Sequence, residues 1–426
     1  MKIEKKHLLD YTILIPYLIL SVVGLIVVYS TTSASLVSFG ANPFASVINQ
    51  GVFWLVSLFF IFFIYRLKLN FLRKDKVLGT VIVFEVFLLV FAKFFTKEIN
   101  GANGWIVLGP LSFQPAEYLK IIVVWFLAHT FSKKQSAIER YDYQALTKNR
   151  WIPRKRSQLN DWRYYLLVMI GLVAIQPDLG NAAIIVLTTV VMFSISGVGY
   201  RWFTALFAGI VGLSSAFLGL IALVGVQTMA KVPIFGYVAK RFAAYFNPFK
   251  DLTGSGLQLS HSYYAMSNGG WFGLGLGNSI EKTGYLPEAT TDFVFSVVIE
   301  ELGLIGAGLI LALLFFLILR IMIVGVKARN PFNSMMALGV GALMLMQVFV
   351  NIGGISGLIP STGVTFPFLS QGGNSLLVTS VGIAFVLNIA ANEKRDNIVQ
   401  AIEEELSQTQ ELENQNEKIV PLRRSR

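Results

Sequence analysis

The sequence predicts an all-α polytopic membrane protein of ten transmembrane helices, with both termini in the cytoplasm and a large extracytoplasmic loop between helices 7 and 8. Composition, apolar segments and the placement of positive charge predict this class. Hydrophobic residues occupy 54% of the 426 positions, only 14% are charged, and the mean hydropathy is +0.63. This composition is far from that of a soluble domain.

The ten predicted helices are apolar segments of about 20 residues, the length that crosses a hydrocarbon core roughly 30 Å thick. They lie near residues 11–30, 48–66, 77–95, 116–132, 164–177, 181–198, 202–229, 293–325, 334–357 and 374–392. The first segment follows basic residues, as in a secretion signal, but its apolar run of about 20 residues exceeds the usual 7 to 15. We therefore interpret it as a retained membrane anchor.

Lysine and arginine collect in every second loop, and cytoplasmic loops are the ones enriched in these residues. The clusters lie at residues 2–6, 66–76, 133–163, 201, 327–329 and 394–395. The sequence therefore predicts a cytoplasmic N-terminus (1–10), a ten-helix membrane domain (11–392) with a basic cytoplasmic loop (133–163) and a large extracytoplasmic loop (230–291), and a cytoplasmic tail (393–426).

The net charge of +11 is spread over the predicted cytoplasmic loops, which favours contact with anionic membrane lipids over nucleic acid binding. The absence of cysteine excludes disulfides and thiol catalysis. The three histidines are scattered and indicate no histidine metal site. In the tail, Ile398, Ile402 and Leu406 have the spacing of one helix face, but the polar composition favours a solvated, partly disordered segment.

Asp292 is the leading candidate for a catalytic residue. It lies where a polar, glycine-rich loop meets the eighth apolar segment, and ionisable groups at such positions are functional candidates because they are costly to bury. A helix cap, in which Thr291 or Asp292 accepts hydrogen bonds from first-turn amides, explains the position equally well. The two roles do not exclude each other.

Two further segments carry polar groups near the predicted outer face. Glu117 and Lys120 are three residues apart on the fourth helix, so they share a face and can neutralise each other, which is as compatible with a structural pair as with a site. Asp178 follows a proline in a short outer turn, where a turn or cap role is more typical.

The predicted outer loop 230–291 is long enough to indicate a function, because loops beyond about 15 residues tend to be functional. Its cations would suit a phosphate-bearing substrate: Lys231, Lys240, Arg241, Lys250 and Lys282. In the helix that follows, Glu300 and Glu301 differ by about 100° in direction, so at least one faces a neighbouring helix or a wet cavity. Glu300, about 80° from Asp292 in projection, is predicted to share its side.

Residues 360–375 contain two prolines and three glycines, which forbid a simple helix. Non-helical backbone at membrane depth is stable only when protein or water covers it. The segment is therefore predicted to be a re-entrant wall of a cavity.

Six short motifs occur in an order that resembles the SEDS family of bacterial cell-wall polymerases, over residues 10–393. The motifs are QPAEYLK (114–120), PDLG (177–180), GLGNS (275–279), LPEATTDF (286–293), PSTG (360–363) and SQGG (370–373). The loop that ends at Asp292 resembles the FtsW branch of this family more than the RodA branch. Thr290 stands where many members have histidine, and Gln371 where many have tyrosine, so a catalytic role for that histidine is in doubt here.

The resemblance implies a peptidoglycan glycosyltransferase that polymerises lipid II at the outer face of the cytoplasmic membrane during septal cell-wall synthesis. In the family's mechanism, the GlcNAc 4-hydroxyl of one lipid II attacks the anomeric carbon of the lipid-linked strand, and undecaprenyl pyrophosphate leaves. Asp292 matches the family's essential aspartate and is predicted to be the general base. A carboxylate that accepts the hydroxyl proton accelerates such a step, typically by about 10² to 10⁴.

The predicted substrate-binding residues around Asp292 are Glu117, Lys120, Asp178, Arg241, Gln258, Lys282, Glu288, Glu300, Thr362 and Ser370. Arg241, Lys282 and Lys120 are candidates to neutralise the leaving pyrophosphate. The resemblance is compatible with a divalent cation, Mg²⁺ or Mn²⁺, although the sequence contains no dedicated set of ligands. The implied partners are a class B penicillin-binding protein (a transpeptidase), other divisome membrane proteins, lipid II and membrane lipids, without nucleic acid.

Three other functions are open at this point: a lipid II flippase, a RodA-like elongation polymerase, and a scaffold that recruits a penicillin-binding protein. A flippase needs polar groups through the whole thickness of the membrane. The conspicuous polar groups in this chain cluster in the predicted outer half, which favours the enzyme.

Overall fold

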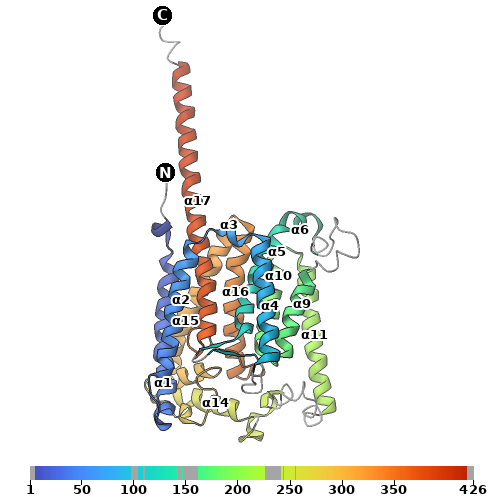
Figure 1. The fold of residues 1–426 in the computed structure, drawn as a ribbon, viewed down its shortest axis with the longest axis vertical. Helices are drawn as coiled ribbons and strands as arrows, with labels where there is room; N and C mark the ends of the chain where they lie inside the picture. Colours follow the sequence, from blue (N-terminus) through green and yellow to red (C-terminus); the bar gives the residue numbers. More distant parts are fainter. Residues whose placement is uncertain are drawn as a thin grey trace, which may run out of the picture.

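A computed structural model shows a bundle of long helices that run side by side (Figure 1). The structure describes residues 5–96, 104–108, 111–142, 146, 162–225, 241–242, 244–254 and 256–419. The elements in chain order are η1 (Lys5–Leu8), α1 (Tyr11–Ser38), α2 (Ala45–Arg66), α3 (Leu69–Leu72), α4 (Asp75–Phe95), β1 (Ile106–Leu108), β2 (Leu111–Phe113), α5 (Pro115–Lys133), α6 (Gln135–Tyr141), α9 (Trp162–Ile175), α10 (Leu179–Ile195), α11 (Tyr200–Val224), η2 (Pro248–Lys250), α14 (Leu257–Gly269), η3 (Glu281–Thr283), α15 (Val294–Lys327), α16 (Pro331–Ile355) and α17 (Gly373–Ile419).

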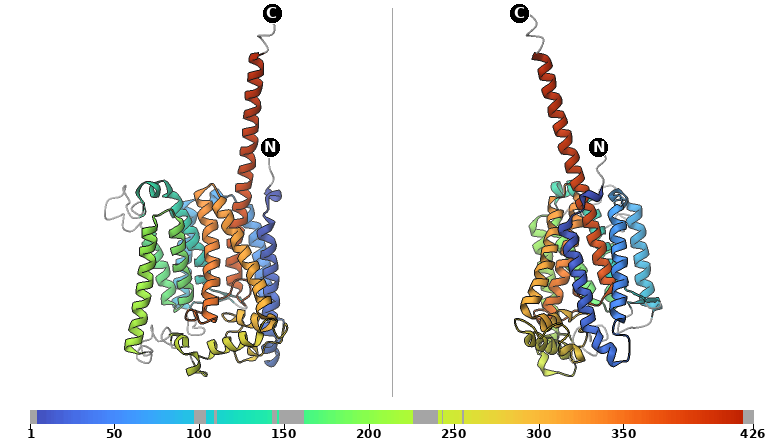
Figure 2. Two further views of the ribbon diagram at one scale, coloured as in Figure 1. Left: turned by 180° about the vertical axis from the view of Figure 1, so that it is seen from behind. Right: turned by 90° about the vertical axis from the view of Figure 1, so that its left-hand side faces the viewer.

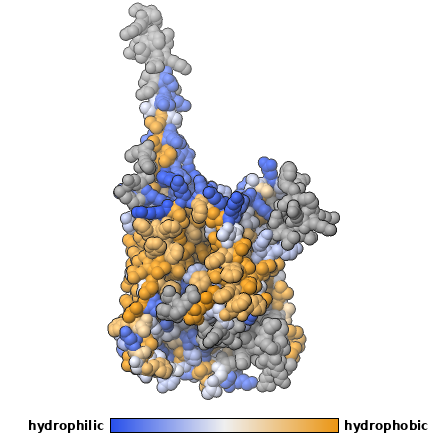
Figure 3. Space-filling model, viewed as in Figure 1, coloured by the Kyte–Doolittle hydropathy of each residue, from blue (hydrophilic) through white to orange (hydrophobic). Residues whose placement is uncertain are grey.

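Each predicted apolar segment falls on a helix of the bundle: α1, α2, α4, α5, α9, α10, α11, α15, α16 and α17. Within the described part of the chain, six helices are long and apolar enough to cross a membrane: α1, α2, α4, α15, α16 and α17. Figure 3 shows apolar side chains across the middle of the face in view, below a hydrophilic end. The chain is therefore a mostly helical, multi-pass membrane protein.

The centre of the bundle is built from α16 and α17. α16 packs against α5, α10 and α15, and α17 packs against α2. α16 begins cleanly because Asn330 caps the free amides of Phe332 and Asn333, and Pro331 occupies the first helical position, where its missing N–H has no cost. Because α16 packs against α15, which runs in the opposite direction, the end of α16 lies near the start of α15, where the candidate site lies.

Three elements differ from the prediction. The outer segment before α5 contains an antiparallel hairpin, β1–β2, so the fold is not purely helical. The large outer loop contains a helix, α14, which packs against α15. α17 does not end near residue 392 but projects far beyond the bundle (Figures 1 and 2), because the chain has neither glycine nor proline from residue 392 to residue 419. The expectation of a partly disordered tail was therefore wrong for residues 393–419.

α15 is broken at Gly303, whose backbone angles (φ 70°, ψ 176°) lie outside the helical region. The break frees main-chain groups, and the glycine-rich stretch after α14 satisfies them; we call residues 269–277 the glycine loop. Four hydrogen bonds join the two segments: Leu274 N to Glu300 O (2.9 Å), Gly275 N to Glu301 O (2.9 Å), Leu304 N to Gly270 O (2.9 Å) and Ile305 N to Trp271 O (3.2 Å). The glycine loop thus fills the break in a membrane helix.

Gly303 is required by this arrangement, so Gly303→Ala is expected to destabilise the protein. A Cβ at this position would lie 2.3 Å from Trp271 O, and the backbone angles belong to a region that costs other residues about 1–3 kcal/mol. Gly308→Ala is the matched control, because nothing lies within 4 Å of a Cβ there. Thermal unfolding in nanodiscs should show a lower midpoint for the first variant alone; equal midpoints would contradict the role of the break.

Candidate active site

Three donors from other parts of the chain hold the backbone just before α15. Gln371 N donates to Thr290 O (2.8 Å), Ser370 Oγ to Thr291 O (2.6 Å), and Asn351 Nδ2 to Asp292 O (2.7 Å). The three donors belong to three different residues far away in the sequence, so together they fix the position of this loop. Thr290 and Gln371 are therefore neighbours in space.

Two of these donors belong to residues 360–372, which we call the wall segment. It is not helical, and its apolar side chains are buried, among them Phe366, Phe368 and Leu369. The prediction of a covered, non-helical segment is confirmed. Phe366 stacks on Phe295 of α15 at 4.6 Å between ring centres, which holds the wall segment against the helix that follows Asp292.

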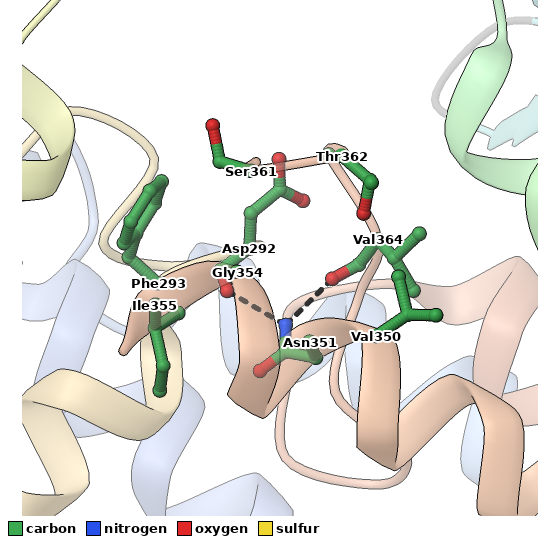
Figure 4. A pocket seen from close by; sticks show the side chains of 10 residues that line it. Asp292, Phe293, Val350, Asn351, Gly354, Ile355, Ser361, Thr362 and Val364 are labelled. Atoms are coloured by element: carbon green, nitrogen blue, oxygen red, sulfur yellow. Dashed lines mark hydrogen bonds between the residues drawn. The ribbon is translucent and has the colours of Figure 1, made fainter. Parts of the chain in front are cut away.

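Asn351 of α16 joins the two sides of the site. Its Nδ2 donates both to Asp292 O and to Val364 O (2.6 Å), as Figure 4 shows. One turn earlier, Gln347 Nε2 donates to Thr365 O (3.0 Å) in the wall segment. The sequence analysis missed Asn351, although an asparagine in an otherwise apolar helix is the kind of intramembrane polar residue that indicates a role.

The side chain of Asp292 points into a small, open hollow (Figure 4). The hollow is lined by Asp292, Phe293, Val350, Asn351, Gly354, Ile355, Ser361, Thr362, Gly363 and Val364. The N-cap of α15 is Phe293, without a capping side chain, so the cap interpretation of Asp292 is wrong. No described residue donates a hydrogen bond to its carboxylate.

The surroundings of Asp292 make its carboxyl group a better base. Burial and, to a smaller extent, the negative charge of Glu288 raise its pKa, and the positive charge of Arg241 lowers it; the resulting pKa is about 7. Arg241 Nη1 donates to Ser361 O (2.6 Å). A Cβ added to Gly363 would lie 3.3 Å from Arg241 Nη2 and 3.4 Å from Asp292 Oδ2, so the glycine keeps open the space between the cation and the carboxylate.

A second group of charges lies behind the wall segment. Glu117 and Lys120 form a buried ion pair (2.8 Å), as their spacing predicted. Asp178 caps α10, as predicted, and accepts from Asn181 N (3.1 Å); burial raises its pKa. α10 contacts the wall segment closely, because a Cβ on Gly180 would lie 2.6 Å from Thr362 O. The charges of Glu117 and Asp178 thereby contribute to the raised pKa of Asp292.

Two predicted substrate-binding residues, Glu300 and Lys282, lie away from the hollow beside Asp292. Glu300 is fully buried and accepts hydrogen bonds from the outer loop: Asn268 Nδ2 (3.0 Å), Ser279 Oγ, Ile280 N (3.2 Å) and Glu281 N (3.3 Å). Lys282 is also buried; its Nζ pairs with Glu301 (2.5 Å) and donates to Ser30 Oγ (2.9 Å). Both residues fasten the outer loop to α15, and neither lines the hollow.

The remaining candidates are placed as follows. Thr362 lines the hollow, Ser370 holds Thr291 O, and Gln258 lies on α14 outside the lining of the hollow. Lys231 and Lys240 fall outside the described residues.

Within the described part of the chain, no group of three or more histidine, aspartate or glutamate side chains could hold a metal ion, so the structure assigns no ligands to a divalent cation.

A family model of the cell cycle proteins FtsW, RodA and SpoVE matches residues 11–395. The chain belongs to this family. A Lactococcus lactis member named as a probable peptidoglycan glycosyltransferase FtsW is 47% identical over 93% of this chain and 96% of its own length. A Bacillus subtilis member of the same name is 35% identical over 89% and 90%. A solved chain from a peptidoglycan synthase complex that coordinates polymerisation and crosslinking aligns with a TM-score of 0.66, at 25% identity over 90% of this chain and 98% of that chain.

Asn351→Leu is expected to loosen the site, because the carbonyls of Asp292 and Val364 lose their common donor in an apolar setting. The expected cost is about 1–3 kcal/mol for each carbonyl. Ser356→Ala, at the end of the same helix, is the matched control, because its hydroxyl makes only a long contact of 3.4 Å to Gly353 O. Thermal unfolding should separate the two variants; an Asn351→Leu midpoint equal to that of the control would show that the two carbonyls do not depend on this side chain.

Proposed function

We propose that this protein is a peptidoglycan glycosyltransferase that polymerises lipid II into glycan strands at the outer face of the cytoplasmic membrane, at the division septum. The names of its relatives support the activity. The observation that carries the assignment to a site is the carboxylate of Asp292, which faces a hollow, accepts no hydrogen bond from the described residues and has a pKa raised to about 7.

In the proposed reaction, Asp292 accepts the proton of the GlcNAc 4-hydroxyl of the acceptor lipid II. The freed oxygen forms a bond to the anomeric carbon of the lipid-linked strand, and the bond from that carbon to the pyrophosphate oxygen breaks. A base works best when its pKa is close to the operating pH, which the environment of Asp292 provides. Undecaprenyl pyrophosphate leaves with the bonding electrons, and Arg241 is placed to stabilise its charge.

The other site residues take different roles in this proposal. Thr362, Glu288 and Arg241 contact substrate around the hollow, while Glu117, Lys120 and Asp178 set its electrostatics from behind the wall segment. Ser370 and Asn351 position the loop of Asp292. Glu300 and Lys282 are structural, because their polar groups form hydrogen bonds that hold the outer loop. Gln258 on α14 contacts the part of the substrate that lies farther from Asp292.

We place the termini in the cytoplasm and the hollow outside it, with ten helices crossing the membrane. The start of α1 and the projecting end of α17 lie at one end of the bundle, and α14 lies at the other (Figures 1 and 2). Basic residues near the first end support this orientation, among them Lys5, Arg66 and Arg73. The limits 1–10, 11–392 and 393–426 then separate cytoplasmic from membrane regions, although α17 runs through the last boundary.

A class B penicillin-binding protein is the proposed partner, together with other membrane proteins of the divisome. The structural similarity to a chain from a complex that coordinates polymerisation with crosslinking supports it. Lipid II and membrane lipids complete the set of ligands. No role is assigned to a metal ion.

Asp292→Asn is expected to lower glycan polymerisation by about 10² to 10⁴ when the purified protein is given lipid II and its cognate penicillin-binding protein, because the general base is lost while the shape is kept. Asp396→Asn, at an exposed carboxylate on the projecting part of α17, is the control and should polymerise normally. Undiminished polymer from Asp292→Asn would falsify the catalytic assignment.

The same variant separates the alternative functions. If Asp292→Asn still translocates lipid II across vesicle membranes but no longer polymerises it, the flippase function is favoured. If cells that carry only Asp292→Asn divide normally, the scaffold is the function that remains. Imaging of a fluorescent fusion separates septal from elongation synthesis, since a RodA-like polymerase would follow the side wall.

The polymerisation rate is expected to rise with pH through about 7, because Asp292 acts only when its carboxyl group has lost its proton. Glu288→Gln removes a negative charge that raises the pKa of Asp292, so the rising limb should move to lower pH. Asp396→Asn, far from the hollow, should leave the limb in place. A limb that does not move in Glu288→Gln would contradict the electrostatic account.

A further inference from the structure

The glycine loop presents a row of exposed apolar side chains. Trp271 is 68% exposed, Phe272 83%, Leu274 39% and Leu276 55%. Four large apolar side chains within six residues, with glycine between them, are unusual on a surface that faces water, where exposed apolar residues are normally scattered.

Part of the backbone of the same loop is hydrogen-bonded inside the protein. The four hydrogen bonds across the break in α15 pair the main-chain groups of Gly270, Trp271, Leu274 and Gly275, and Gly273 N donates to Gly269 O (2.7 Å). Irregular backbone is stable at membrane depth only when its polar groups are bonded inside the protein. The bonded part of the glycine loop meets this condition, and the side chains of the loop are all apolar.

The depth of the loop follows from α15. From Leu304, just after the break, to Lys327, the helix rises about 36 Å at roughly 1.5 Å per residue, compared with a hydrocarbon core of about 30 Å. Lys327 lies at the charged end of the bundle, so Leu304 lies within about a turn of the opposite edge of the hydrocarbon core. The loop is bonded to the amides of Leu304 and Ile305 and therefore lies at that edge.

The exposed side chains are continuous with the lipid-facing surface of α15. Leu304, Ile305 and Leu309 are exposed on this helix, which is one of those long and apolar enough to cross the membrane. Trp271 carries the donor N–H that makes tryptophan frequent at the boundary between headgroups and acyl chains. Lipid is therefore the occupant that the surroundings of the loop indicate.

We propose that Trp271, Phe272, Leu274 and Leu276 insert into the leaflet on the side of Asp292 and contact its acyl chains. The chain just after the glycine loop is also fixed, because Ser279, Ile280 and Glu281 donate hydrogen bonds to the carboxylate of Glu300. The insertion therefore sets the height of the outer loop relative to the membrane. The inference concerns the lipid contact itself and does not depend on the proposed enzymatic activity.

The natural absence of cysteine makes a direct test possible, because a single introduced cysteine is the only labelled site. Phe272→Cys is labelled with the environment-sensitive dye NBD in nanodiscs that hold one copy of the chain and no partner protein. Leu309→Cys, on the exposed face of α15, is the lipid reference, and Thr283→Cys, exposed in η3 of the same outer loop, is the water reference. All three positions are exposed, so the label fits without repacking.

The expected emission of the label at Phe272→Cys is shifted towards that of Leu309→Cys, and its quenching by dithionite is at least severalfold slower than that of Thr283→Cys. Nitroxide-labelled lipids should quench it as well. Emission and quenching equal to those of Thr283→Cys would overturn the proposal. Shielding that arises only when the penicillin-binding protein is added would also overturn it, in favour of a protein contact.

Discussion

Three hydrogen bonds to three consecutive carbonyl groups, at residues 290–292, are the constraint on which the candidate site depends. The donors come from α16 and from the wall segment, so the loop of Asp292 takes its position only when both are in place. Asn351 binds the loop and the wall segment with one amide group. The main chain is held by the protein, and no described residue donates a hydrogen bond to the carboxylate, which suits the preorganised base that we propose.

The break in α15 provides the second constraint, and it explains why Glu300 and Lys282 are buried in contacts with the outer loop. Residues 293–301 are buried in protein, whereas the longer part of α15 beyond the break has exposed apolar side chains along one side. The glycine loop, Glu300 and Lys282 all serve the junction between the two parts. The charges of Glu300 and Lys282 hold the outer loop, and among the described residues Arg241 is the cation beside Asp292.

Much of the fold could be predicted from the sequence because long apolar segments and breaks rich in proline and glycine have direct structural meanings. Asp292 could be found for the same reason, since a carboxylate at the mouth of an apolar helix is conspicuous. The break at Gly303 could not, because glycine is common in membrane helices and the break is stable only with the distant glycine loop. The roles of Glu300, Lys282 and Asn351 likewise depend on partners that sequence spacing does not reveal.

The central claim is that the acceptor sugar hydroxyl meets the side chain at position 292. The most direct measurement is a cryo-electron microscopy structure of the Asp292→Asn variant with its penicillin-binding partner and lipid II in nanodiscs. The account predicts a sugar hydroxyl within about 3 Å of the side chain at position 292. It also predicts the pyrophosphate near Arg241 and the three carbonyl bonds intact. A sugar bound away from the hollow, with these bonds unchanged, would contradict the account.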